Sequence, residues 1–439
     1  MLQLLKSVKN QFSPQRSLTR LAKSELKTDL LGLPAHDPGP EAVIASCIQW
    51  LCRAQDKSAS QDGGVARDFS LIHGWATSYP ETTGYIIPTM IAMAQRDGDA
   101  RLHERARRML DWCVAIQFAE GGFQGGKIDA KPRVPVTFNT GQILIGLAAG
   151  AAEYQDPRYL EAMHRAASWL RDSLDDDGCW RKFSTPFAKP GEKAYETHVS
   201  WGLFEAERVA PGHGYGAAGL RQVDWALTKQ QANGWFASNC LTDVEHPLTH
   251  TIGYVLRGVL EGHLLSGRAD LLQAAIRTAN GLLGAIGPGG YMAGRLDRHF
   301  GPAADYACLT GSAQIAHCFF LLYRLTGEAR YLAAGQKLNA FVRRTVLLDG
   351  HDDRVGGVKG SFPVNGAYGQ WQYLNWAAKF CIDANLLEVE LGATALEETE
   401  LEETGPAKAE RPRVQLAKAE LAQAADLMEI ELAGSSGNA

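Results

Sequence analysis

The chain contains 439 residues, of which 45% are apolar, 21% charged and 9% aromatic, and its formal net charge is −5. These values are ordinary for a globular protein and exclude a disordered chain, a collagen-like chain and a small disulfide scaffold. The longest uncharged stretch, residues 134–152, contains Pro135 and several polar residues, so we expect a buried helix there and no integral membrane segment.

The first 39 residues form a basic leader. In residues 1–28 the lysines and arginines face a single acid, Glu25, and no apolar run is long enough for the core of a signal peptide. We therefore expect a cytoplasmic protein with a solvated, frayed N-terminus; a membrane surface or a partner is the alternative for these charges. The chain between the two termini is nearly neutral, so no nucleic-acid partner is expected. The cysteines are spread singly, which indicates reduced thiols.

An internal repeat of about 57 residues organises the chain from residue 40 onward. The segment that starts at Asp99 resembles the one that starts at Asp156, and the Arg-Tyr-Leu pattern of Arg158 returns at Arg330. Each copy reads as an amphipathic helix with Asp156 as an N-cap in the clearest case. Its apolar stripe comprises Leu160, Met163, Ala167, Leu170 and Leu174. Six such helices are expected to begin near Pro40, Asp99, Asp156, Gly214, Gly267 and Gly327.

A second set of six helices is apolar nearly all round, which predicts burial on every side. These segments are 83–95, 138–154, 195–209, 248–267, 306–326 and 373–388. Two concentric rings of six helices satisfy both patterns, so the sequence predicts an all-α protein with an (α/α)6 toroid over residues 40–392. A linear solenoid is the alternative, but it would leave its terminal inner helices uncovered.

Most of the amphipathic helices are followed by a glycine and an aromatic residue. The turns are Gly121-Gly122-Phe123, Gly178-Cys179-Trp180, Gly234-Trp235-Phe236 and Gly289-Gly290-Tyr291. With Gln117 and Gln230 ahead of two of them, they resemble the glutamine-tryptophan motifs of squalene-cyclase and prenyltransferase repeats, and equally the hairpins of six-hairpin glycosidases. The resemblance covers roughly residues 40–390 and implies the toroid; it leaves the chemistry open.

Residues 393–439 differ in composition from the rest. Ten acids face four bases between residues 397 and 439. We expect an acidic linker followed by a short helical or disordered tail.

Chemistry is expected where the chain enters the inner helices, because these entries converge on one end of a toroid. The entries are residues 78–85, 137–142, 194–201, 243–254, 305–314 and 366–376. They are rich in aromatic, carboxylate, amide and imidazole side chains, which suit a sugar. The expected substrate-binding residues are Tyr79, Asn139, Gln142, His198, Trp201, His246, Arg295, Asp305, Trp371 and Gln372.

The residues at these helix entries are compatible with two kinds of reaction. Glu81 and Glu196 are candidate catalytic carboxylates for a glycosidase, although acids at helix N-termini also serve as caps. His250 and Tyr254, one helical turn apart, are candidate bases for a lyase or epimerase of uronic acids, which abstracts the proton α to a carboxylate. Such an enzyme also needs a group that neutralises the substrate carboxylate, for which Asn139, Arg257 or Arg295 is available.

A metal site is considered and set aside. Cys240, His246 and His250 have a spacing that zinc ligands can have, but Pro247 interrupts it. The run Asp175-Asp176-Asp177 lacks the Asp-x-Asp-Asp pattern of terpene cyclases and is expected to be a solvated turn. We therefore predict neither a metal nor a cofactor.

The function predicted first is a carbohydrate-active enzyme, a glycoside hydrolase or a uronic-acid polysaccharide lyase or epimerase, acting on an oligosaccharide or polysaccharide. A terpenoid cyclase or prenyltransferase-like protein is the second interpretation, favoured by the glycine-aromatic turns. A non-catalytic glycan-binding protein is the third.

Overall fold

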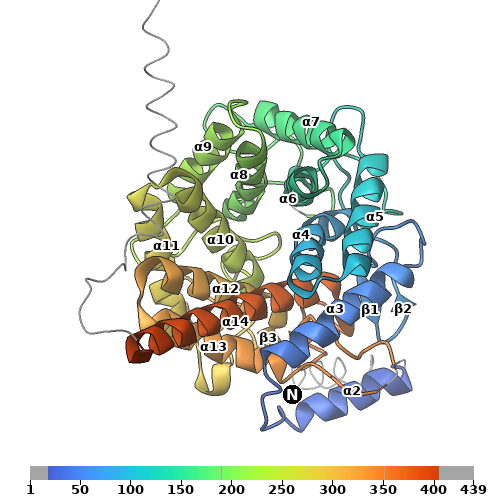
Figure 1. Ribbon diagram of the computed structural model, residues 1–439, viewed down its shortest axis with the longest axis vertical. Helices are drawn as coiled ribbons and strands as arrows, with labels where there is room; N and C mark the ends of the chain where they lie inside the picture. Colours follow the sequence, from blue (N-terminus) through green and yellow to red (C-terminus); the bar gives the residue numbers. More distant parts are fainter. Residues whose placement is uncertain (1–17, 189, 351, 405–439) are drawn as a thin grey trace, which may run out of the picture. The chain divides into compact units, whose positions relative to one another are not determined.

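Two concentric rings of helices build the protein (Figure 1). The computed structural model describes residues 18–188, 190–350 and 352–404, with side chains up to residue 393. The inner ring consists of α4 (Pro80–Asp97), α6 (Thr137–Tyr154), α8 (Thr197–Val209), α10 (Thr249–Ser266), α12 (Leu309–Thr326) and α14 (Asn375–Thr404). The outer ring consists of α3 (Pro40–Asp56), α5 (Ala100–Ile116), α7 (Pro157–Ser173), α9 (Tyr215–Leu227), α11 (Ala269–Gly284) and α13 (Ala329–Arg343). This confirms the predicted (α/α)6 toroid.

The inner ring is closed. Its first and last helices meet where the Thr89 hydroxyl donates to Asp383 Oδ1 at 2.7 Å, and the rings of Tyr85 and Phe380 lie 5.4 Å apart. The two ends of the repeat array therefore cover each other, which a linear solenoid could not achieve.

The outer helices have the expected single apolar face. In α7 the Asp156 side chain caps the helix by accepting from the Arg158 backbone N–H, and Met163, Ala167 and Leu170 are fully buried. Leu160 was predicted in the same stripe but is 38% exposed; Tyr159, one position earlier, is buried in its place. The apolar stripe is thus displaced at the start of the helix.

The inner helices approach one another closely through glycine. A Cβ on Gly146 of α6 would overlap the carbonyl oxygen of Gly84 in α4. Such contact lets two helix backbones lie closer than larger side chains allow, so the ring stays narrow at this level.

Each glycine-aromatic turn follows one outer helix in the chain and packs against the next outer helix of the ring. Gly121 has a φ of 106° and lies on the carbonyl of Arg165 in α7, while Phe123 is fully buried. The Gln117 side chain donates to the carbonyl oxygens of Gly121 and Ala162, which holds the turn on α7. The predicted glutamine therefore secures the contact between neighbouring repeats.

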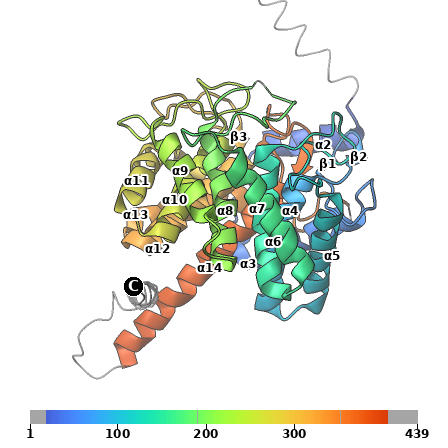
Figure 2. The ribbon, with the colours of Figure 1, turned by 90° about the horizontal axis from the view of Figure 1, so that it is seen from above.

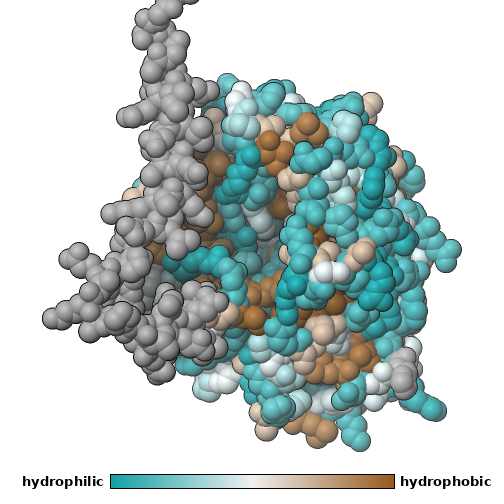
Figure 3. All heavy atoms as spheres, viewed as in Figure 1, coloured by the Kyte–Doolittle hydropathy of each residue, from teal (hydrophilic) through white to brown (hydrophobic). Residues whose placement is uncertain are grey.

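The longer connections lie at one end of the toroid, where Figure 2 shows the loops gathered. They contain a three-stranded sheet with the order β2 (Gly74–Trp75), β1 (Asp68–Ser70), β5 (Gln372–Leu374) and a two-stranded sheet of β3 (Ala307–Cys308) with β4 (Ser361–Phe362), all antiparallel. Short 3₁₀ helices, η2 (Ala194–Glu196) and η3 (Pro288–Gly290), complete this layer. The opposite end, viewed in Figure 3, is mostly hydrophilic, with hydrophobic residues recessed between the helices.

The described part of the leader is ordered, in contrast to the frayed terminus expected from its charge. Residues 20–30 form α2 (Arg20–Leu30). Its Glu25 and Asp29 are buried, and both accept hydrogen bonds from the buried ammonium of Lys359. The net basic charge of the leader did not reveal that the two acids of α2 lie, with Ala22, on its buried face.

The chain divides after Leu391 into two compact units. In the second unit the backbone of α14 remains helical to Thr404, where an acidic linker was expected from residue 393. The tail predicted beyond it lies outside the described residues. Among the described residues no helix is long and apolar enough to cross a membrane.

Replacing Gly146 with alanine should destabilise the protein by about 1–3 kcal/mol, because the added methyl group overlaps the Gly84 carbonyl and forces α4 and α6 apart. Chemical denaturation measures this. Gly284→Ala, at the end of α11, is the matched control, since a Cβ there meets no described atom within 4 Å. Equal stability of the two variants would contradict the close-packing argument.

Candidate active site

A cavity of about 280 Å³ opens among the N-terminal ends of the inner helices. It is lined by Arg67, Tyr79, Glu81, Tyr85, Gly126, Phe138, Asn139, Thr185, Phe187, Ala188, Tyr195, Cys240, Leu241, Thr242, Leu248, His250, Thr251, Tyr254, Tyr368 and Trp376. These residues come from five inner-helix entries and from the loops between them. The structure thus brings distant segments together at one rim, as the toroid implies.

Glu81 lies in the first turn of α4 with its two oxygens in different surroundings. Oε2 accepts hydrogen bonds from the Tyr79 hydroxyl at 3.1 Å and from the Asn139 side-chain amide at 2.9 Å. Oε1 has no hydrogen bond with any residue that the structure describes. In the protonated acid the proton therefore belongs on Oε1.

Burial raises the pKa of Glu81 to about 7, against the opposing effects of the Tyr79 hydrogen bond and the Arg67 charge. The neutral carboxylic acid is therefore populated near neutral pH. A carboxyl group poised in this way is suited to general acid–base chemistry.

His250 supplies a group of the opposite kind. Its Nδ1 lies 2.9 Å from Gln314 Oε1, so Nδ1 carries the proton and Nε2 has a free lone pair. Burial lowers the pKa of His250 to about 4, which keeps the ring neutral near pH 7. No residue that the structure describes accepts from or donates to Nε2. His250 can therefore accept a proton from a ligand.

Tyr254, the other candidate base, lies one turn beyond His250 and also lines the cavity. Its ring lies 4.3 Å from the His250 ring, and burial raises its pKa well above the ordinary value. The phenol stays protonated near neutral pH, so its hydroxyl can donate a hydrogen bond to a ligand as well as accept one.

The remaining wall is largely aromatic. Phe138 lies 5.3 Å from Tyr195 and 5.2 Å from Tyr254 between ring centroids, and Tyr79 lies 6.0 Å from Trp376. Phe187, at the mouth, is 54% exposed. Such rings stack against the C–H faces of a sugar or another flat apolar ligand.

Of the residues predicted from the sequence, the structure brings Tyr79, Glu81, Asn139, His250 and Tyr254 to this cavity. All five lie within the first two turns of an inner helix or directly before it. Three others lie deeper in the ring. Gln142 Oε1 is 2.6 Å from His198 Nδ1 in a buried pair, and Trp201 is buried with its Nε1 donating to Glu205.

Glu196 does not line the cavity, although its neighbour Tyr195 does. Its side chain is buried and its Oε2 has no described hydrogen-bond partner. Burial raises the pKa of Glu196 to about 8, with Lys193 opposing the shift. The structure therefore provides a buried neutral acid, but places it behind the wall.

The other predicted ligands lie outside the cavity, in the loop layer. His246 is half exposed and interacts with Asp243, Arg295 donates to the backbone carbonyl of His246, and Asp305 is exposed. Trp371 and Gln372 are partly buried, Gln372 as the first residue of β5 and Trp371 directly before it. These residues stand in loops, whose path is not set by helix periodicity, so their distance from the cavity could not be predicted from the sequence.

Several cavity residues escaped the sequence analysis. Arg67, before β1, places its guanidinium 5.0 Å from the Trp376 ring and 5.9 Å from that of Tyr79. Tyr368 reaches the cavity from the loop after β4. Tyr368 and Trp376 both lie inside the predicted entry segment 366–376, which was a usable signal for them, whereas Arg67 lies outside every predicted entry.

The zinc ligands considered above are not assembled. Cys240 and His250 line the cavity, whereas His246 pairs with Asp243 in the loop layer. Across the described part of the chain, no three His, Cys, Asp or Glu side chains are grouped as a metal ion would need.

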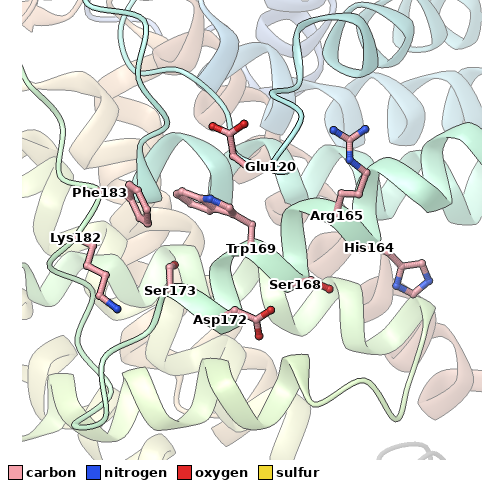
Figure 4. Close-up of a pocket in the computed structure, with 9 residues that line it drawn as sticks. All are labelled: Glu120, His164, Arg165, Ser168, Trp169, Asp172, Ser173, Lys182 and Phe183. Carbon is pink, nitrogen blue, oxygen red and sulfur yellow. The ribbon is translucent and has the colours of Figure 1, made fainter.

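A larger groove, of about 620 Å³, lies outside the ring along α7 (Figure 4). Trp169 and Phe183 form its aromatic part with ring centroids 4.7 Å apart, and Arg165 at its edge donates to the carbonyl of Phe118. It is an open depression beside one outer helix. The cavity at the inner helices, with its buried acid and base, is therefore the candidate active site.

Comparison with known proteins places the fold. No family model matches the chain, and no curated protein matches it in sequence. Solved structures do match: the unsaturated glucuronyl hydrolase from Bacillus sp. GL1 (15% identity, TM-score 0.65, 81% of this chain and 98% of that one); the cellobiose 2-epimerase from Bacillus thermoamylovorans B4167 (11%, 0.62, 83% and 98%); and a D-mannose isomerase (13%, 0.64, 82% and 99%). At these identities the similarity establishes the toroid fold.

Infrared titration should detect the protonated Glu81 directly. The carbonyl absorption of its carboxylic acid should disappear with a midpoint near pH 7 and be absent from the Glu81→Gln variant, because burial favours the neutral form. A second midpoint near pH 8 should disappear only in Glu196→Gln. A Glu81 midpoint near 4.5 would contradict the burial argument.

The same pKa shift links stability to pH. Since the native state holds the Glu81 proton more tightly than the unfolded chain, the contribution of Glu81 to the free energy of unfolding falls as pH rises from about 4.5 to 7.

Proposed function

We propose that this protein is a carbohydrate-active enzyme, a hydrolase, lyase or epimerase, and that the cavity at the inner-helix N-termini holds the reacting sugar unit. The observation that carries the proposal is the buried Glu81 carboxyl, with one oxygen held by Tyr79 and Asn139 and the other without a partner among the described residues. The aromatic wall suits a sugar ring. The fold is also that of proteins described as a glucuronyl hydrolase, an epimerase and an isomerase.

Glu81 acts as the general acid in this proposal. Oε1 donates its proton to an oxygen or carbon of the sugar, and the carboxylate that remains is stabilised by the hydroxyl of Tyr79 and the amide of Asn139. Both hydrogen bonds strengthen as negative charge develops on Glu81, so they favour the proton transfer.

His250 acts as the complementary base. The helix that carries it, α10, is fourth in a ring of six whose first member carries Glu81, so the two groups stand on opposite walls. A sugar between them can lose a proton to Nε2 on one side and gain one from Glu81 on the other. This arrangement favours a lyase or epimerase within the wider class.

The alternatives find less support in the cavity. A two-carboxylate glycosidase needs a second acid, and Glu81 is the one carboxylate among the described residues that line the cavity. Isoprenoid cyclisation needs a stronger acid motif or a metal cluster, and the described residues form no such cluster. The cytoplasmic location inferred from the leader stays a prediction.

The activity is tested with a panel of neutral and uronic-acid oligosaccharides. New reducing ends without ultraviolet absorbance indicate hydrolysis, both signals together indicate a lyase, and a change of sugar composition by NMR without either indicates an epimerase. A sugar that binds but is unchanged under all conditions would instead make this a glycan-binding protein.

On any sugar that is turned over, Glu81→Gln should lower kcat/KM by about 10²–10⁴-fold, the usual contribution of a positioned acid. The exposed Glu161→Gln on α7 is the control and should keep full activity. Undiminished turnover in Glu81→Gln would refute the assignment of the acid.

The pH profile of kcat/KM should be bell-shaped. Activity falls below about pH 4, where His250 becomes protonated and loses its free lone pair, and above about pH 7, where Glu81 loses its proton. His250→Gln should remove the acidic limb together with most of the activity. An unchanged acidic limb in that variant would assign the base elsewhere.

A further inference from the structure

A second depression adjoins the cavity at Arg67. It has a volume of about 480 Å³ and lies over the three-stranded sheet, where Arg67, Asp68, Trp75, Lys127 and Gln372 contribute to its lining. Arg67 lines both spaces. The Arg67 side chain therefore lies at the boundary that the two spaces share.

Arg67 has donors to spare at this junction. Its Nη1 donates to Asp68 Oδ2 at 2.7 Å and to Gln372 Oε1 at 3.3 Å. Nε and Nη2 make no hydrogen bond with any side chain or backbone group among the described residues. A guanidinium with a free edge binds a carboxylate with two parallel hydrogen bonds.

The charge of the depression favours an anion. Among the described residues that line it, Arg67 and Lys127 contribute two cations, and the one carboxylate, Asp68, is already paired with Arg67. One positive charge is left over within this lining, carried by the half-buried Lys127. Asp129, which accepts from the Thr77 hydroxyl, is not among the lining residues.

Trp75 provides a fixed surface in the same depression. Its ring lies 5.3 Å from that of Trp50 and 5.2 Å from that of Phe69, and it is partly exposed. An indole held in this way presents a face on which a sugar ring can stack without a cost in side-chain order. Gln372, beside it, has a side-chain NH₂ that donates to no described group.

We propose that the depression is a second subsite for the neighbouring unit of the substrate, and that the substrate is an acidic oligosaccharide whose carboxylate is bound by Arg67 at the junction. The inference rests on the proposed function, since it takes the cavity as the site of the reacting unit. It makes Arg67 and Lys127 specificity residues for chain length and charge.

Binding to the full chain, measured by calorimetry, tests this without turnover. The probes are the monomers and dimers of galacturonic, glucuronic and mannuronic acid, with cellobiose as the neutral dimer. At least one acidic dimer should bind about tenfold more tightly than its monomer and than cellobiose, the gain that one extra charge-assisted hydrogen bond provides. If no acidic dimer exceeds its monomer by that ratio, the second subsite is refuted; if cellobiose binds as tightly, its acid selectivity is refuted.

Substitutions in the depression test whether the tighter binding of the dimer arises there. Lys127→Met and, separately, Gln372→Ala should reduce the dimer-to-monomer affinity ratio toward one, whereas Lys337→Met, an exposed lysine on α13, should leave it unchanged. A ratio that survives both substitutions would place the second unit elsewhere. Because Glu81→Gln addresses catalysis and these variants address binding, either proposal can fail while the other stands.

Discussion

The close approach of the inner helices is the constraint on which the site depends. Gly146 meets the Gly84 carbonyl, and Gly202 of α8 meets that of Gly141 in α6 in the same way. Six helices packed at this distance leave a cavity of about 280 Å³ at their N-terminal ends, which is small enough for walls on opposite sides to contact one ligand. Larger side chains at these glycine positions would hold the inner helices, and with them the walls that carry Glu81 and His250, farther apart.

The same packing sets the protonation states. Burial in a low-dielectric setting disfavours the charged form of either group, so it raises the pKa of Glu81 and lowers that of His250. The hydrogen bonds then determine which atom can react: Tyr79 and Asn139 occupy one oxygen of Glu81, and Gln314 occupies Nδ1 of His250. One physical effect thereby produces an acid and a base that coexist near neutral pH.

The loop layer supplies the positively charged side chain of the cavity, Arg67. Among the described lining residues, the inner-helix entries contribute no lysine or arginine to the cavity; Arg67 comes from the segment before β1, where its guanidinium donates to Asp68 and Gln372. The antiparallel pairing of β1 with β5 joins the segment before the first inner helix to the segment before the last one. The sheet thus brings a guanidinium and an indole to the side of the ring where the chain closes.

The sequence by itself determined the helix pairs, the closed ring and the end at which chemistry gathers, because these follow from periodicity and from glycine at the turns, which are local properties. It also located Glu81, Asn139 and His250, which stand in first turns where position along the helix nearly fixes position in space. Depth and direction were decided only by the tertiary structure: Gln142, one turn beyond Asn139, lies below the cavity, and Glu196 points away while Tyr195 lines it. Adjacent helical residues differ by about 100° in direction, and the protonation of each depends on what surrounds it, which distant segments supply.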